Sequence, residues 1–279
     1  MYEAHFGLQE APFALTPNTR YFLRAPSHND ALELLLVALR EREGFIKITG
    51  EVGTGKTLLC RLLLNALDGE ASTAYLPNPH LSAEALYEAV AEELGVEPVA
   101  GANTHQVLKA LNERLISLAM DRTPAVLVID EAQAMPEATI EALRLLTNLE
   151  TESTRLLQVV LFGQPELDAL LNRDSLRQLK QRITFHYRLL PLDRDSVAQY
   201  LRHRLALAGY NGTDLFQPTA LRLITRASGG IPRLINVLAH KSMLAAWGQG
   251  DSRISRGHVL RAVQDTESAR APGLLARWL

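Results

Sequence analysis

The chain has 279 residues, of which 47% are hydrophobic, so it is long enough to bury a sizeable core in one large domain or two smaller ones. Its 29 basic and 31 acidic residues give a formal net charge of -2, which excludes a global field that draws the chain to nucleic acid or an anionic membrane. A single cysteine, Cys60, excludes an intrachain disulfide, and no stretch reaches the roughly 20 apolar residues of a membrane span. We therefore expect a soluble protein of the reducing cytoplasm that reaches a membrane only by recruitment.

The first 40 residues combine a segment rich in proline and aromatic residues with a helical pattern. Ser27 is the expected N-cap of this helix, whose apolar period includes Ala31, Leu34, Leu35 and Ala38. This opening predicts a docked arm followed by a helix.

Five short apolar runs follow, and longer segments with helical periodicity or turn chemistry separate them. The runs are GFIKITG, STAYLP, AVLVID, LLQVVLFG and ITFHYRLLPL. Their alternation with helices predicts a three-layer α/β domain with a mostly parallel sheet. After Pro191 the strand signals stop, and four amphipathic segments predict a small helical domain: RDSVAQYLRHRLALAGY, PTALRLITRAS, PRLINVLAHKSMLAAW and SRGHVLRAVQDT.

The first apolar run ends in a loop of glycines, a lysine and a threonine that leads directly into a helical pattern. The loop fits G-x-x-x-x-G-K-[ST] in the strand-to-helix context that this motif requires. Glycines let the backbone turn and bring N–H groups close to an anion, and the helix directs its positive dipole end to the same place. We therefore predict an ATP- or ADP-binding loop made of Gly50, Glu51, Val52, Gly53, Thr54, Gly55, Lys56, Thr57 and Leu58.

Two residues of this loop have predicted chemical roles. Lys56 is expected to reach the β- and γ-phosphates, and the Thr57 hydroxyl to be a ligand of Mg²⁺. The competing interpretation is a glycine-rich turn that carries a solvated lysine.

A second signal is the segment PAVLVIDEAQ, which places Asp130 and Glu131 at the end of a fully apolar strand. Asp130 is expected to hold Mg²⁺ through its water shell, and Glu131 to orient and deprotonate the attacking water. Alternatively, both are solvated acids at a strand end, an interpretation that the nearby phosphate loop weakens. No N-K-x-D or T-K-x-D element occurs in the sequence, which favours adenine over guanine nucleotides.

Five linked motifs resemble those of one protein family. They are the phosphate loop, the D-E-A-Q box, RLLTNLET, LLQVVLFGQPEL and GGIPRLINVL, in this order. The sequence from Met1 to about Gln264 resembles the AAA+ ATPases of the ExeA/GspA type, which serve type II secretion. Its short length and its opening, MYEAHFGL…PFALTPNT, are most similar to the MSHA-type pilus biogenesis ATPases. Secretion-type relatives continue into a transmembrane helix and a peptidoglycan-binding domain that this sequence lacks, so wall binding is not expected.

The resemblance implies further site residues. Gln164 matches the polar sensor that touches the γ-phosphate or the attacking water, although a glutamine beside a proline is also an ordinary turn residue. Arg233 matches a second sensor at the start of a lid helix, although an arginine in a first helical turn is also favourably placed on a surface. Asn78 matches the polar residue that restrains the catalytic glutamate, and it fits a turn-forming asparagine equally well.

The family commonly completes its site with an arginine from a neighbouring subunit, because the transferring phosphoryl group develops negative charge. Candidates are Arg173, Arg177 and Arg182. Arg182 is the first choice because it lies just before the last strand, where the resemblance places this arginine. Each of the three could instead solvate a helix face.

Together the motifs and the resemblance predict a P-loop AAA+ domain at 1–190 with sheet order 5-1-4-3-2, a helical lid at 191–267 and a tail at 268–279. The expected activity is hydrolysis of ATP with Mg²⁺ by a homo-oligomer that drives pilus or secretion machinery, through partners at the inner membrane. The alternative is a nucleic-acid-associated AAA+ ATPase, against which the balanced charge argues. The tail, ARAPGLLARWL, is either a short amphipathic contact element or a segment that packs on the lid or frays.

Overall fold

A computed structural model describes residues 1–97, 101–147 and 155–270, and its internal contacts divide the chain into two units. The sheet unit comprises His28–Val52 and Lys56–Leu189. The helical unit comprises Met1–Ser27, Gly53–Gly55 and the chain from Leu190 on. The contacts of the first 27 residues therefore place them in the helical unit, whereas the sequence analysis assigned them to the α/β domain at 1–190. Most of the expected tail lies outside the described residues.

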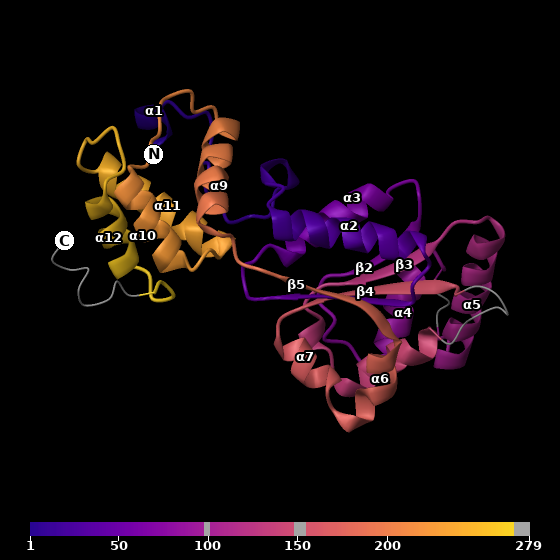
Figure 1. The fold of residues 1–279 in the computed structure, drawn as a ribbon. Coiled ribbons are helices and arrows are strands. Elements are labelled where there is room, and N and C mark those ends of the chain that lie inside the picture. The colour runs from indigo at the N-terminus through magenta and orange to yellow at the C-terminus, as the bar shows by residue number, and fades with distance from the viewer. Residues whose placement is uncertain (98–100, 148–154, 271–279) are drawn as a thin grey trace. The chain divides into compact units, whose positions relative to one another are not determined.

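The sheet unit is built on five parallel strands. They are β1 (Phe45–Gly50), β2 (Ser72–Leu76), β3 (Ala125–Ile129), β4 (Leu157–Gly163) and β5 (Ile183–Leu189). Their order is β2-β3-β4-β1-β5, which confirms the expected order 5-1-4-3-2 counted from the other edge (Figure 1). The registers pair Phe45 with Val159 of β4 and Ile46 with Phe185 of β5.

Burial explains the strand patterns. Every residue of β3 and β4 is buried, because helices cover both faces of these inner strands. In the edge strand β5, half-buried and exposed residues alternate as far as the buried Leu189, so one face of this strand is open to solvent.

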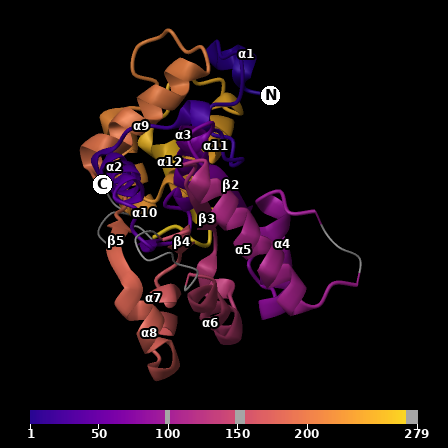
Figure 2. The ribbon, with the colours of Figure 1, turned by 90° about the vertical axis from the view of Figure 1, so that its right-hand side faces the viewer.

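Helices cover both faces of the sheet (Figure 1). Leu35 of α2 (Pro26–Arg40) and Leu63 of α3 (Lys56–Leu67) share a core with the strands on one face. The other face has a second core, and α4 and α5 lie side by side there (Figure 2). The elements on that face are α4 (Ala83–Glu93), α5 (Thr104–Met120), η2 (Ala132–Ala134), α6 (Glu137–Leu146), α7 (Glu166–Leu171), η3 (Asp174–Leu176) and α8 (Arg177–Arg182).

The start of α2 differs from the expectation. The helix begins at Pro26, so Ser27 is inside its first turn and is not its N-cap. Proline is favoured at this position because its missing N–H needs no helical partner there. The Ser27 hydroxyl instead accepts a hydrogen bond from the Leu190 N–H at 3.0 Å.

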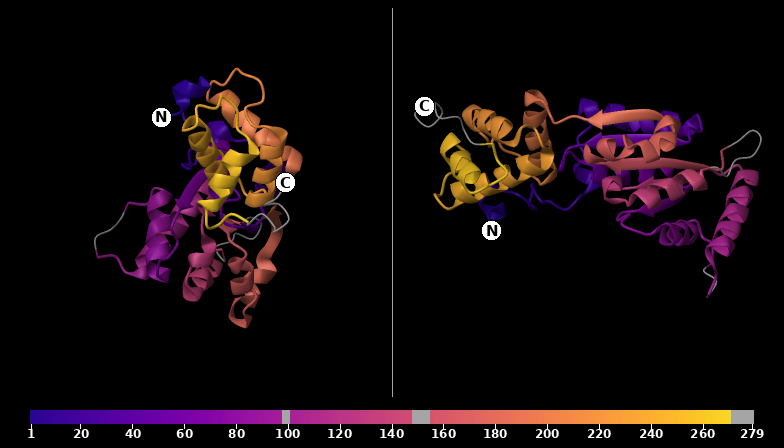
Figure 3. Two further views of the ribbon diagram at one scale, coloured as in Figure 1. Left: turned by 90° about the vertical axis from the view of Figure 1, so that its left-hand side faces the viewer. Right: turned by 90° about the horizontal axis from the view of Figure 1, so that it is seen from below.

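The helical unit packs its N-terminal arm against a bundle in which α10, α11 and α12 contact one another (Figure 3). Its elements are α1 (Glu3–Phe6), η1 (Thr19–Tyr21), α9 (Arg194–Leu207), α10 (Pro218–Ser228), α11 (Pro232–Trp247) and α12 (Arg256–Gln264). The buried Arg204 anchors the arm, because its guanidinium donates to the carbonyl of Pro12 at 2.5 Å and lies 4.6 Å from the Tyr21 ring centroid. The four helices after β5 match the four predicted segments.

The parallel sheet also sets the position of the predicted site. The carboxyl ends of β1, β4 and β3 lie next to one another, because these three strands are consecutive neighbours in the sheet. Gly50 ends β1, Asp130 follows β3 and Gln164 follows β4. In open α/β sheets ligands bind at this carboxyl edge.

None of the helices among the described residues is both long enough and apolar enough to cross a membrane.

Candidate nucleotide site

The phosphate loop joins β1 to α3 through backbone turns that depend on glycine. Gly53 and Gly55 have φ angles of +80° and +104°, a region that other residues rarely adopt. The loop leads from Gly50 at the end of β1 to the first turn of α3. It thus has the form of a strand-to-helix anion loop.

Lys56 is the first residue of α3 and is buried, with 5% of its surface exposed. Its Nζ donates to the carbonyl oxygens of Gly50 at 2.8 Å and Glu51 at 3.1 Å. Burial lowers the pKa of Lys56, and the charges of Glu131 and Asp130 partly counter this effect. The ammonium group is therefore held over the loop by carbonyls, where an added anion would compensate its lost hydration.

The other loop residues differ in their exposure. Glu51 pairs with Arg188 of β5 at 3.5 Å, and Val52 is 54% exposed. Thr54 is fully buried, whereas Leu58 is half-buried in α3.

Thr57 and Asp130 come from different elements and meet at the carboxyl edge. The Thr57 hydroxyl donates to Oδ2 of Asp130 at 2.7 Å, and Asp130 Oδ1 accepts from the Glu131 backbone N–H at 2.9 Å. Burial raises the pKa of Asp130, against the lowering effect of these two hydrogen bonds. The site thus places a hydroxyl and a carboxylate side by side.

These two groups fit Mg²⁺, which takes oxygen ligands and usually keeps water and substrate phosphate oxygens as its other ligands. No group of three or more His, Cys, Asp or Glu side chains able to hold a metal occurs among the described residues.

Glu131 has an uncommon backbone, with φ at +52° in the left-handed region. Its Oε2 accepts hydrogen bonds from Gln164 Nε2 at 2.9 Å and from Gln133 Nε2 at 2.5 Å. Burial alone would raise the pKa of Glu131, but these hydrogen bonds and the charge of Lys56 lower it below its ordinary value. Strained backbone held by neighbouring groups is common at functional sites.

Gln133 is the site residue that the sequence reasoning missed. It lies in η2, and its Oε1 also accepts the backbone N–H of Gln164 at 2.9 Å. The only signal in the sequence was the last letter of the D-E-A-Q box.

Three further candidates have no described side-chain contact with Glu131. Asn78 is exposed in the loop after β2, and the described side-chain contacts of Glu131 do not include it. Arg182 ends α8 directly before β5, and its Nη1 donates to the Thr147 hydroxyl at 3.3 Å. Because the strands are parallel, Arg182 lies at the amino edge of the sheet, opposite the phosphate loop. Arg173 pairs with Glu137 at 2.7 Å.

Arg233 belongs to the helical unit, where it is exposed in the first turn of α11. Its backbone N–H donates to the carbonyl of Gly53 at 3.2 Å, within that same unit. A Cβ built on Gly53 would lie 2.7 Å from Cβ of Arg233, so glycine is also required here for close approach.

Residues 39–171 match the protein-family model described as AAA domain. The chain is an AAA domain protein. Over 273 residues it is 41% identical to "General secretion pathway protein A" of Aeromonas hydrophila, and this match covers 98% of the chain. The same match covers 50% of that protein, so the chain spans about half the length of this curated relative. The resemblance to the ExeA/GspA type is thereby confirmed at the level of homology.

Solved structures share the AAA+ fold of this AAA domain protein. Cdc6p from Pyrobaculum aerophilum has a TM-score of 0.68 at 20% identity, covering 94% of this chain and 70% of that chain. The Aeropyrum pernix ORC1 protein in complex with DNA has a TM-score of 0.67 at 22% identity, covering 92% and 69%. The Thermotoga maritima RuvB Holliday junction branch migration motor has a TM-score of 0.57 at 17% identity, covering 85% and 68%. At these identities the similarities show the fold alone.

Proposed function

We propose that the chain binds ATP with Mg²⁺ and hydrolyses it to ADP and phosphate. One observation carries this proposal: the carboxyl ends of β1, β3 and β4 are neighbours, and hydrogen bonds at this edge of the sheet unit join Thr57 to Asp130 and Gln164 to Glu131. Lys56 is held at the same edge by the carbonyl of Gly50, which ends β1. Phosphoryl transfer to water needs groups that bind the phosphates, ligands for a metal ion and a group that orients the water.

Each residue has a role that its contacts suit. Lys56 exchanges the carbonyls of Gly50 and Glu51 for phosphate oxygens, and so regains partners for its ammonium group. Thr57 and Asp130 would hold Mg²⁺, which when bound neutralises charge on the phosphates. Glu131 would accept the proton of the attacking water, and Gln164 would donate a hydrogen bond to the γ-phosphate or to that water.

A test compares two variants with matched exposed controls. Lys56→Ala should abolish nucleotide binding, whereas Glu131→Gln should bind ATP normally and lose roughly 10²- to 10⁴-fold in turnover, the usual contribution of a general base. Lys109→Ala and Glu113→Gln make the same changes at side chains that are 70% and 67% exposed, and should match the wild type. Equal loss of binding in the two site variants would contradict the role given to Glu131.

The use of the hydrolysis is the second part of the proposal. Homology to a general secretion pathway protein supports a role in secretion-related machinery, and the MSHA-type pilus is the finer assignment. A homo-oligomer in the cytoplasm is the form that we propose for this role. Conformational change powered by ATP would be passed to partners at the inner membrane.

Affinity capture with the Glu131→Gln form in ATP tests this assignment. Recovery of a secretin or an inner-membrane pilus protein, absent when Lys56→Ala is used, is the expected outcome. DNA in the eluate, retained in a salt-dependent manner, would favour the nucleic-acid-associated alternative instead.

A further inference from the structure

We infer that Gln133 is a positioning residue that fixes the orientation of the Glu131 carboxylate by bridging it to the backbone of Gln164. The inference rests on the proposed hydrolysis of ATP and adds a residue to that same site. It gives Gln133 the restraining role that the family resemblance suggested for Asn78.

The bridge is made by the two ends of one amide. Gln133 Nε2 donates to Oε2 of Glu131 at 2.5 Å, and Gln133 Oε1 accepts from the Gln164 N–H at 2.9 Å. A carboxylate can only accept and a backbone N–H can only donate, so these partners allow one orientation of the amide. A rotated amide would lose both hydrogen bonds.

The backbone around the amide supports this placement. Gln133 lies in the tight turn η2, which begins directly after Glu131 and is closed by a hydrogen bond from Ala134 N to Glu131 O at 2.8 Å. Gly163 ends β4 beside it, and a Cβ there would lie 3.3 Å from Gln133 Oε1 and 2.6 Å from Cδ2 of Leu167. A larger residue at Gly163 would thus crowd the amide that carries the bridge.

The arrangement distinguishes the two glutamines that hold Glu131. Gln164 contacts Oε2 through its side chain, and that contact is lost when this side chain turns to donate to a phosphate. Gln133 contacts the backbone of Gln164 and not its side chain. Its hydrogen bond to Glu131 is therefore kept when the Gln164 side chain rotates toward a phosphate. Oε2 thus stays occupied by an amide, and Oε1 is the oxygen presented to water.

Gln133→Met tests the inference, because methionine has a similar shape and no amide. We expect the turnover number to fall by up to roughly 100-fold, as for other small misplacements of a catalytic group, while KM and the measured affinity for ATP change less than twofold. Gln264→Met makes the same change at an exposed residue of α12 and should match the wild type. Gln133→Glu keeps the acceptor for Gln164 and loses the donor, so it should be as slow as Gln133→Met.

A double-mutant cycle separates positioning from a structural role. In the Glu131→Gln background there is no carboxylate to orient, so adding Gln133→Met should cause no further loss of turnover. If the losses of turnover from the two single changes multiply in the double variant, the inference is overturned. A lower melting temperature together with weaker ATP binding in Gln133→Met would also overturn it. Wild-type turnover in both Gln133 variants would overturn this inference but not the proposed function. Absence of hydrolysis by the wild-type chain and by Gln264→Met would overturn the proposed function and this inference together.

Discussion

At the scale of single residues, the buried groups beneath the phosphate loop divide into reactive and inert ones. Asp130 and Lys56 are buried but joined to polar partners, which keeps them available for exchange with a ligand. Cys60 lies one helical turn after Lys56, is fully buried, and belongs to the apolar core shared by α2 and α3. Its position close to the loop does not by itself make it reactive.

The first prediction is that Cys60 is chemically inert in the folded chain. Burial raises the pKa of its thiol, and the thiolate is the reactive form, so modification by a thiol reagent should be much slower in native buffer than in denaturant. Cys60→Ala should retain nearly full ATPase activity, because a buried cysteine acts as a small apolar side chain. Fast native modification that ATP prevents would contradict this.

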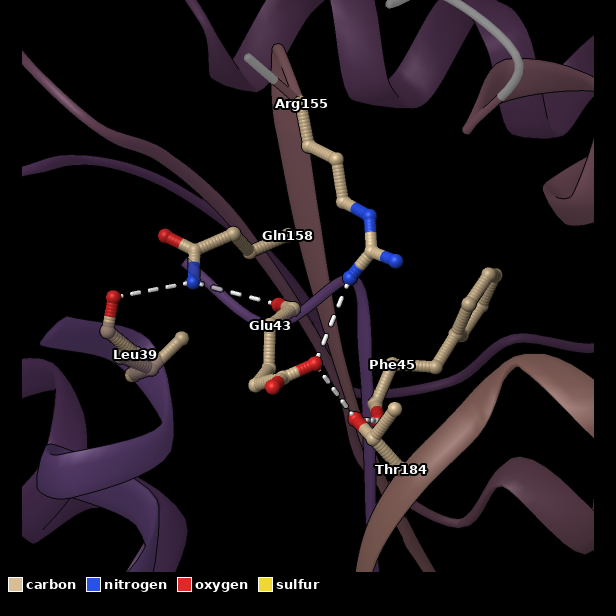
Figure 4. A network of polar contacts seen from close by, with 6 residues as sticks. All are labelled: Leu39, Glu43, Phe45, Arg155, Gln158 and Thr184. Carbon is tan, nitrogen blue, oxygen red and sulfur yellow. Dashed lines mark hydrogen bonds and ion pairs between the residues drawn. The ribbon is translucent and has the colours of Figure 1, made fainter. Parts of the chain in front are cut away.

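At the scale of elements, one polar network joins the end of α2 to the amino ends of three strands (Figure 4). Gln158, buried at the start of β4, donates its Nε2 to the carbonyls of Leu39 at 3.0 Å and Glu43 at 3.2 Å. The Glu43 carboxylate contacts Arg155 at 3.3 Å and the Thr184 hydroxyl at 2.8 Å. A glutamine in an otherwise apolar strand is therefore a connector between elements.

The second prediction follows from this network. Gln158→Leu should lower the free energy of unfolding by about 1–3 kcal/mol, because two buried carbonyls lose their donor. Denaturant melting of this variant should be compared with Gln178→Leu, an exposed change on α8 that should stay within roughly 0.5 kcal/mol of the wild type. Equal stability of the two variants would show that water replaces the Gln158 amide at no cost.

At the scale of the whole molecule, Arg182 bears on assembly. It lies at the amino edge of β5 and shares a small cavity with Arg155, Thr147 and Phe45, whereas the phosphate loop is at the carboxyl edge of the same sheet. Within one sheet unit, then, Arg182 and the loop are at opposite ends of the strands. A catalytic role for Arg182 therefore requires the site of a second copy.

The third prediction is that specific activity rises with protein concentration. Arg182→Ala should lower turnover, by an amount that can reach roughly 10³-fold or more for an arginine acting in trans, without weakening ATP affinity. Arg222→Ala removes an exposed arginine of α10 that is not among the three candidates, and it serves as the control. A turnover rate independent of concentration in a strictly monomeric sample would exclude this role.

The sequence by itself determined the local features of this protein. The five apolar runs became β1 to β5, and the four later amphipathic segments became α9 to α12, because hydrophobic period and turn residues act over a few neighbouring positions. The phosphate loop could be predicted equally well, since all of its residues are contiguous in the sequence. The sheet order followed from the family resemblance.

Only the tertiary structure decided which distant residues meet. Gln133 contacts the backbone of a residue 31 positions away, and Arg204 binds the carbonyl of Pro12 across 192 positions. Such pairs cannot be predicted from the hydrophobic periodicity of the sequence. Each depends on how separate elements pack and on which buried polar groups need a hydrogen-bond partner there. The same reason explains why Gln133, in the turn after β3, was not predicted as a partner of Glu131.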